Sequence, residues 1–187
     1  GLLGFKLTEE YSYVADPWEL AYKMVNAANN FIYYVDKLSE NLFGENRKTE
    51  MLAEAKFARA FGHAFLLRRY GYFWDINSPL GPIIRLEPSS ISNNSMGRSS
   101  VKESYEKIFE DLDYAIQYGP RFYSKYRSCA TTAKAFKADI LMNRGEEGDY
   151  AEAIRLANEV IASDEFGLED KYEDIFTNGY SSKELMF

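Results

Sequence analysis

The chain has 187 residues and a formal net charge of −7, with 46% hydrophobic and 27% charged residues. This composition is ordinary for a globular fold, and the length suits one compact domain or a short helical array. The negative charge disfavours nucleic-acid binding, which needs a basic surface to displace phosphate counterions. No apolar run approaches the roughly 20 residues of a membrane-spanning helix.

Apolar residues spaced three and four apart predict two helices in the first part of the chain. The first is expected to begin after Asp16, with Pro17 in its first turn, and to end near residues 41–44. The second is expected over about Arg47 to Tyr70, because Gly71 provides a stop signal there.

Three more helices are predicted in the second half. The third opens at Ser99-Ser100 with Glu103 in a capping-box position and ends at Gly119-Pro120. The fourth is expected over about Thr131 to Asn143, and the fifth over Asp149 to Ser163. The predicted fold class is therefore mainly α.

The remaining segments are predicted to be irregular. Residues 72–98 and 164–183 form two long loops, and loops of this length are usually functional or disordered. Within and after them, residues 82–84 and 185–187 each fit a short strand or a sheet edge.

The joint between the fourth and fifth helices has a recognisable pattern. Residues 143–154 read NRGEEGDYAEAI, a glycine-containing turn followed by Gly-Asp-Tyr and a small residue. This resembles the joint of a tetratricopeptide repeat, in which small residues let paired helices pack closely. We therefore expect tetratricopeptide-like helical hairpins, stacked in an array with long irregular loops.

No catalytic, metal or cofactor motif is found. His63 is the only histidine and lies in the middle of a helix, so we interpret it as a packed residue rather than a metal ligand. The acidic pair Glu110-Asp111 falls on a polar helix face and is interpreted as solvated surface, not as a glycosidase carboxyl pair. The sequence predicts a protein that is not an enzyme and needs no cofactor.

The stretch after the second helix carries the candidate site. Aromatic rings offer apolar faces to the C–H groups of sugars, and nearby amides or carboxylates hydrogen-bond their hydroxyls. The alternative is that the aromatic residues only fix the loop to the helices and that the polar residues form turns. The candidate ligand-binding residues are Tyr72, Phe73, Trp74, Asp75 and Asn77.

A set of motifs in order along almost the whole chain resembles the SusD/RagB family of outer-membrane nutrient-binding lipoproteins. The matching stretches are YKMVNAAN at 22–29, EAKFARAF at 54–61, RRYG at 68–71, LGPII at 80–84, Arg98-Ser99 followed by SYEKIFEDLDYAI, the stretch 130–163, Tyr172, Ile175-Phe176, and SKELMF at 182–187.

The resemblance implies a role and a location. It implies a protein on the extracellular face of the outer membrane that captures a glycan and delivers it to a SusC-type TonB-dependent transporter. Family members are longer, with a lipidated N-terminal cysteine and a large C-terminal lobe. Residues 1–187 are therefore expected to be an incomplete SusD-like helical domain, held at the membrane only through a lipid anchor outside this chain.

The family does not fix which residues bind sugar, so the aromatic loop remains a hypothesis from local chemistry. The competing interpretation of the chain is a tetratricopeptide-like scaffold that binds a peptide or partner protein. A basic or asparagine-rich concave groove would favour the scaffold, whereas exposed, coplanar aromatic rings beside the loop would favour a glycan.

Overall fold

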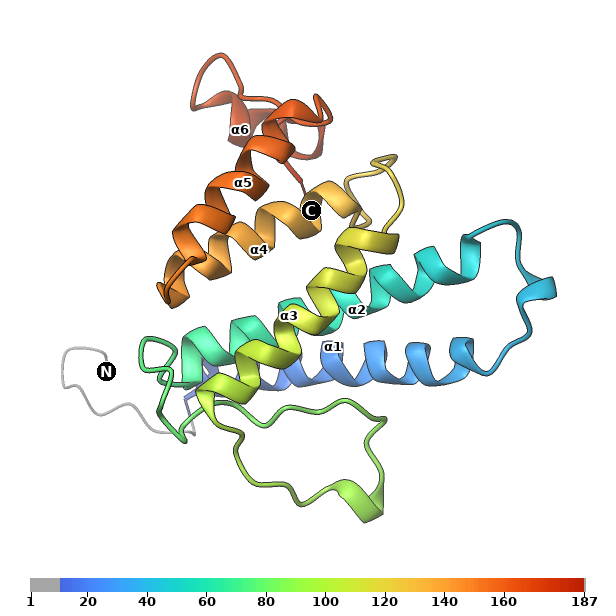
Figure 1. Cartoon of the computed structure of the whole chain (residues 1–187), viewed down its shortest axis with the longest axis vertical. Helices are drawn as coiled ribbons and strands as arrows, with labels where there is room; N and C mark the ends of the chain where they lie inside the picture. Colours follow the sequence, from blue (N-terminus) through green and yellow to red (C-terminus); the bar gives the residue numbers. More distant parts are fainter. Residues whose placement is uncertain (1–10, 187) are drawn as a thin grey trace.

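The computed structural model describes residues 11–186 and is helical, as the sequence predicts (Figure 1). No β-strand occurs within the described range. The helices are α1 (Ser12–Asp36), α2 (Arg47–Tyr70), α3 (Val101–Tyr118), α4 (Ala130–Arg144), α5 (Asp149–Ala162) and α6 (Asp174–Thr177), with single 3-10 turns at η2 (Glu40–Leu42), η3 (Ile91–Asn93) and η4 (Gly179–Ser181).

The start of α1 differs from the prediction. The helix begins at Ser12, so Pro17 lies in its second turn and Asp16 is not its cap. Contacts with the end of α2 explain the extension, because the Tyr70 hydroxyl donates to the Val14 carbonyl (2.7 Å). The ring of Trp18 also packs edge-on against Tyr70, with centroids 5.0 Å apart. Tertiary contacts thus stabilise the first turn of α1, which the sequence analysis placed outside the helix because of Pro17.

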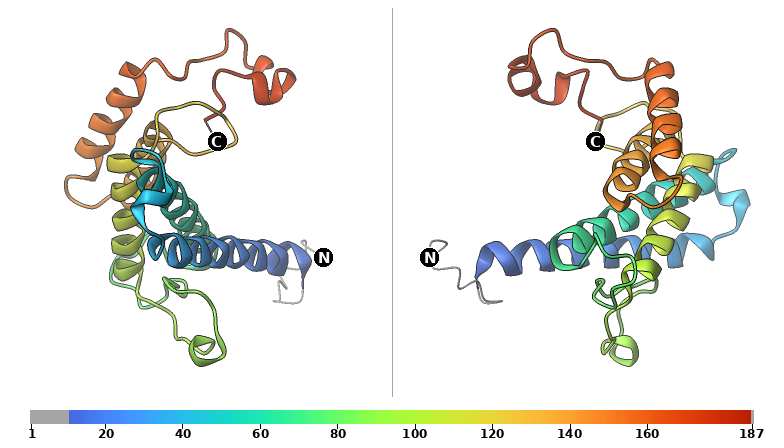
Figure 2. Two further views of the ribbon diagram at one scale, coloured as in Figure 1. Left: turned by 90° about the vertical axis from the view of Figure 1, so that its right-hand side faces the viewer. Right: turned by 60° about the vertical axis from the view of Figure 1, so that its left-hand side comes forward.

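The long helices pack in chain order into an array of hairpins. Helices α1 and α2 run side by side in opposite directions, α3 packs on α2, α4 on α3, and α5 on α4 (Figures 1 and 2). The main core lies between α2, α3 and α4 and consists of Phe57, Ala60, Ala64, Leu67, Val101, Tyr105, Ile108, Leu112, Ala115, Ala133 and Ile140.

The segment after the aromatic loop, residues 82–89, runs along the helices without forming the predicted strand. Side chains of α1 bind its backbone instead: the Tyr22 hydroxyl donates to the Ile83 carbonyl and accepts from the Ile83 N–H, both at 3.0 Å. Asn29 Nδ2 donates to the carbonyls of Arg85 (2.9 Å) and Glu87 (3.0 Å). Because helix side chains satisfy these polar groups, the segment needs no strand partner.

A buried ion pair joins this segment to three helices. Arg59 on α2 donates two hydrogen bonds to Asp111 on α3, at 2.7 and 2.8 Å. Its Nη1 donates to Asn29 Oδ1 (2.9 Å) and to the Leu86 carbonyl (3.1 Å). The interpretation of Asp111 as solvated surface is therefore wrong, because its carboxylate is buried and paired across the core.

Candidate functional site

The candidate aromatic loop, residues 72–77, lies at the end of the molecule where α1 begins, α2 ends and α3 begins (Figure 1). It starts directly after α2, whose last turn is closed by a hydrogen bond from the Gly71 N–H to the Leu67 carbonyl (2.9 Å). The Tyr72 N–H donates to the Leu80 carbonyl (3.0 Å), which closes the loop at its base. The loop is thus short and fixed at both ends.

Two aromatic side chains project from this loop into solvent. The exposed fraction is 48% for Tyr72 and 64% for Trp74. Their rings are nearly parallel, at 20°, with centroids 5.1 Å apart, so they stack on each other instead of lying side by side. One face of each ring is used within the pair, and the Trp74 ring also makes an edge-to-face contact with Phe73 at 5.2 Å, so a ligand would contact the parts of the two rings that stay exposed.

Phe73 has the opposite orientation. Its side chain packs against the core between α2, α3 and α4, and its carbonyl accepts a hydrogen bond from the Tyr105 hydroxyl (2.9 Å). Burial raises the pKa of Tyr105 to about 12, so this hydroxyl stays protonated and remains a donor at ordinary pH. Phe73 therefore anchors the loop, as the alternative interpretation of the aromatic residues expected for it.

The two polar residues of the loop differ in how they are used. Asp75 Oδ1 accepts from the Asn77 N–H (3.1 Å), which makes Asp75 a turn residue. The side-chain amide of Asn77 makes no hydrogen bond to any residue in the described range. It is exposed and has both donors and an acceptor left for a ligand.

Arg98 positions the loop, and the sequence alone did not identify this role. Its Nε donates to the Gly81 carbonyl (2.6 Å), and its Nη2 donates to the carbonyls of Tyr70 (2.7 Å) and Leu80 (3.0 Å). One guanidinium thus ties the end of α2 to the far side of the loop. Arg98-Ser99 was one of the motifs that resemble the family, but nothing in the sequence indicated that Arg98 binds these backbone carbonyls.

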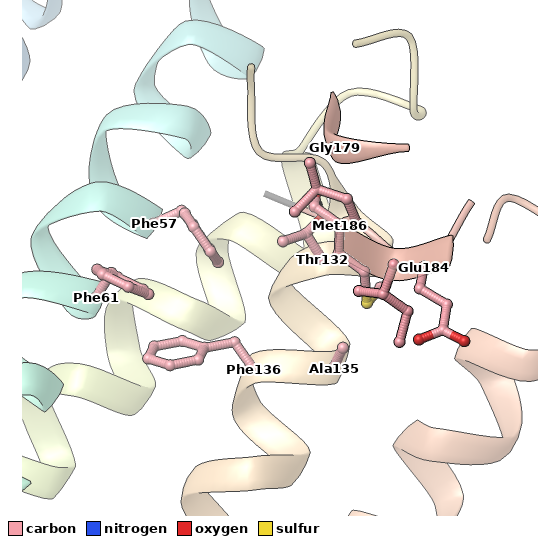
Figure 3. A pocket seen from close by; sticks show the side chains of 10 residues that line it. Phe57, Phe61, Thr132, Ala135, Phe136, Gly179, Glu184 and Met186 are labelled. Carbon is pink, nitrogen blue, oxygen red and sulfur yellow. Dashed lines mark hydrogen bonds between the residues drawn. The ribbon is translucent and has the colours of Figure 1, made fainter. Parts of the chain in front are cut away.

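The structure also contains a separate apolar cavity of about 390 Å³ between α2, α4 and the C-terminal segment (Figure 3). Aromatic rings from α2 and α4 form one wall, and the last described residues form the other. Its one carboxylate, Glu184, accepts a hydrogen bond from the Glu169 N–H (2.7 Å). Its other polar side chain, Thr132, donates to the Met186 carbonyl (3.2 Å), so the polar groups of the lining serve the packing between segments.

Residues 11–186 contain neither a metal-site cluster nor a membrane-spanning helix. No three His, Cys, Asp or Glu side chains in that range come together as a metal site would require. Among the same residues, no helix combines the length and the apolar character needed to cross a membrane.

The array of helical hairpins makes the chain a tetratricopeptide-like helical protein, and the aromatic loop is an addition to that array. Residues 6–141 match the model of a SusD-like family described as "Starch-binding associating with outer membrane". The match covers more than half of the chain, so the chain belongs to this SusD-like family, as the motifs indicated.

Individual relatives agree with this assignment. The chain is 26% identical over 182 residues to a SusD-like protein of Bacteroides ovatus, and 27% identical over 174 residues to SusD-like protein P2 of Formosa agariphila. Each alignment covers 92% of this chain and 32% of the relative. A crystal structure with xylogluco-oligosaccharide is 26% identical, has a TM-score of 0.78, and aligns over 97% of this chain and 37% of its own.

The alignments cover most of this chain but a minor part of each relative. The chain spans about a third of the length of the curated relatives it matches. What the whole relatives bind or assemble with is therefore carried over only as a proposal.

Proposed function

We propose that this protein captures an oligosaccharide at the cell surface and that the aromatic loop takes part in binding it. Membership of a family described as starch-binding supports a glycan as the ligand class. A related structure was determined with xylogluco-oligosaccharide, which is consistent with the same class. The observation that carries the proposal is the exposed Tyr72–Trp74 pair on a loop with fixed ends.

The chemistry of the loop fits a binding protein and not an enzyme. The exposed parts of the Tyr72 and Trp74 rings would supply apolar contact to a sugar, and the unbonded Asn77 amide would supply hydrogen bonds to its hydroxyls. No step forms or breaks a covalent bond. Because the surface is open, we expect modest affinity that depends on how rigidly the rings are held.

The proposal extends to location and partner. The family description associates these proteins with the outer membrane. We infer attachment at its extracellular face through a lipid anchor outside residues 1–187, and transfer of the glycan to a SusC-type TonB-dependent transporter. Copurification of such a transporter with the tagged protein from its native membrane would test the partner.

The first prediction concerns Trp74. A glycan array probed with the protein should show binding to one glycan class, and Trp74→Ala should weaken that binding about tenfold or more. Loss of one stacking face of this kind corresponds to roughly 1.4 kcal/mol. The affinities are to be measured by titration calorimetry with the oligosaccharide selected on the array.

Tyr34→Ala is the matched control, because Tyr34 has the same exposed fraction as Trp74 (64%) and lies near the end of α1 that is opposite to the loop. It should bind with unchanged affinity. Binding that survives Trp74→Ala would assign the site to another part of the protein. An array with no binding would contradict glycan capture itself.

The second candidate function is a protein-interaction scaffold. It is favoured by an apolar hollow of about 460 Å³ beside α1 and α2, whose lining includes Leu20, Met24 and Phe65. The hollow is neither basic nor asparagine-rich, so it does not match the groove expected for peptide recognition. If no glycan binds on the array, copurified proteins would become the leading ligands.

A further inference from the structure

A second cavity lies at the same end of the molecule as the aromatic loop, and the function proposed above makes no use of it. Its volume is about 610 Å³, the largest of the cavities described here. Its lining comes from the first turns of α1, the last residue of α2 and the segment before α3. The lining residues are Val14, Ala15, Trp18, Glu19, Tyr70 and Arg98.

Trp18 forms the aromatic wall of this cavity and is held in a fixed orientation. Tyr70 packs edge-on at 90° with centroids 5.0 Å apart, and Tyr22 packs at 62° and 4.8 Å. Tyr70 is itself fixed by its hydrogen bond to the Val14 carbonyl. Yet 37% of the Trp18 side chain stays exposed. A ring that is locked by neighbours and still accessible loses little entropy when a ligand stacks on it.

Two charged side chains of the lining provide polar contacts. Arg98 uses Nε and Nη2 on backbone carbonyls, and its Nη1 has no hydrogen bond within residues 11–186. Glu19 lies 2.6 Å from Lys23 Nζ, and this ammonium lowers the pKa of the Glu19 carboxyl, which is therefore an ionised acceptor. A donor and an acceptor around an aromatic face match the hydroxyls and C–H face of a sugar.

The cavity and the aromatic loop are joined by shared backbone. The Leu80 carbonyl accepts from Arg98 Nη2 on the cavity side and from the Tyr72 N–H on the loop side. Only Gly71 separates Tyr70, which lines the cavity, from Tyr72, which belongs to the stacked pair. Two residues of extended chain span at most about 7 Å, so the backbone positions of Tyr70 and Tyr72 lie close together.

We propose that this cavity is a second sugar subsite, which binds one residue of the same oligosaccharide whose neighbouring residue stacks on the Tyr72–Trp74 pair. The proposal rests on the proposed function of glycan capture. It assigns Trp18 as the stacking surface, Arg98 Nη1 as a donor and Glu19 as an acceptor. The bound oligosaccharide would therefore be longer than one sugar residue.

The chain allows a direct test because it has two tryptophans, Trp18 and Trp74, one in each subsite. In Trp74→Phe the indole fluorescence reports Trp18 alone, and in Trp18→Phe it reports Trp74 alone. Each variant is titrated with xylogluco-, malto- and cello-oligosaccharides of two to about seven residues. We expect saturable changes in both variants with a long oligosaccharide, at matching midpoints.

A charge variant provides a second measurement that does not depend on the tryptophans. Glu19→Ala removes an exposed acceptor and should weaken binding of the long oligosaccharide several-fold in calorimetry, with an unchanged melting temperature. Glu147→Ala removes an exposed carboxylate in the turn before α5 and should bind normally. This pair keeps the test decisive even if a tryptophan variant does not fold.

The possible results separate the two proposals. If Trp74 responds to sugar while Trp18 is silent and Glu19→Ala binds normally, the second subsite is overturned and glycan capture stands. If Trp18 responds and Trp74 does not, the cavity binds sugar but the shared-ligand arrangement is overturned. If neither tryptophan responds and no calorimetric heat is found with any sugar, the proposed function fails together with the subsite.

Discussion

His63 shows how burial fixes the state of a single side chain. It lies on α2 with no exposed surface, and its Nε2 accepts a hydrogen bond from the Arg85 N–H (3.2 Å). Its Nδ1 has no hydrogen-bond partner. Burial, aided by the positive charge of Arg59, lowers the pKa of His63 from 6.5 to about 3. The imidazole is therefore a neutral packed group, in agreement with its interpretation from sequence.

This lowered pKa predicts a pH-dependent stability. The unfolded chain binds a proton at His63 near pH 6.5, whereas the folded protein binds it only near pH 3. The free energy of unfolding should therefore fall as the pH drops from about 6.5 towards 3, by at most about 1.4 kcal/mol per pH unit from this group. Above pH 6.5 the contribution is complete.

Urea unfolding of the wild type and of His63→Gln at pH 7.5, 6.5 and 5.5 measures this slope. Glutamine cannot titrate, and its amide oxygen can still accept from the Arg85 N–H. The variant should lose most of the decline between pH 6.5 and 5.5, where most carboxylates are still ionised. Parallel slopes in the two proteins would show that folded His63 takes up its proton normally.

At the candidate site the sequence indicated a candidate segment but not which of its side chains are exposed. An alternation of aromatic and polar residues after a glycine stop is visible in the sequence at residues 71–77. Which rings face outward depends on the position of α3, because Tyr105 binds the Phe73 carbonyl and turns that side chain inward. Trp18 was missed for a similar reason, since only the end of α2 makes it part of a cavity wall.

At the scale of elements, the approach of α1 to α2 is set by Gly62. A Cβ atom at this position would lie 2.7 Å from Val25 Cγ2 and 3.4 Å from the Ala21 carbonyl oxygen. A side chain at this position would therefore require the Val25 side chain to move. This close packing places Tyr22 and Asn29 of α1 where they bind the backbone of residues 83–87.

Gly62→Ala should therefore destabilise the protein. Overpacking of a tight contact costs about 1–3 kcal/mol, which exceeds the gain of up to about 1 kcal/mol in helix propensity. Thermal unfolding should show a lower melting temperature for Gly62→Ala and almost no change for Gly44→Ala, where an added Cβ meets nothing within 4 Å. A stabilised Gly62→Ala would mean that the helices separate freely.

Helix α5 illustrates the limit of reading faces from periodicity. Its spacing predicts the helix at nearly the observed boundaries, but only Ala153 and Leu156 of its apolar residues are buried. Tyr150, Ile154 and Ile161 are exposed because α5 packs chiefly on α4. An apolar stripe shows that a helix has a packing face, whereas the number of neighbours decides how much of it is covered.

At the scale of the whole molecule, the hydrophobic core has two parts. The larger cluster joins α2, α3 and α4, and the smaller one joins α4 and α5 through Leu141, Leu156 and two alanines. The partly buried Phe109 and Ile116 contact both. Because the smaller cluster has few members, the α4–α5 hairpin is expected to open more readily than α2 and α3.

Leu156→Ala tests this division. Loss of the buried side chain should cost about 2–5 kcal/mol, and the effect should be concentrated in the α4–α5 hairpin. Hydrogen exchange should become faster in α5 and the end of α4, with little change in α2. Ile108→Ala, in the larger cluster, should instead speed exchange throughout α2 and α3. Equal acceleration everywhere in Leu156→Ala would indicate one cooperative core.

The sequence by itself determined the class of the molecule. Spacing at three and four residues, with glycine and serine at the helix ends, fixed α2 and α3 because these signals are local. The order of the motifs along the chain indicated the family, and the run of aromatic residues in the loop was visible in the sequence.

Only the tertiary structure decided what depends on residues far apart in the chain. It extended α1 past Pro17, buried Asp111 against Arg59, and replaced a predicted strand with a segment bound by helix side chains. It also brought Trp18 against Tyr70 at the end of α2. The physical reason is the same in each case: a burial site or hydrogen-bond partner supplied by a distant segment outweighs a local preference of a few kcal/mol.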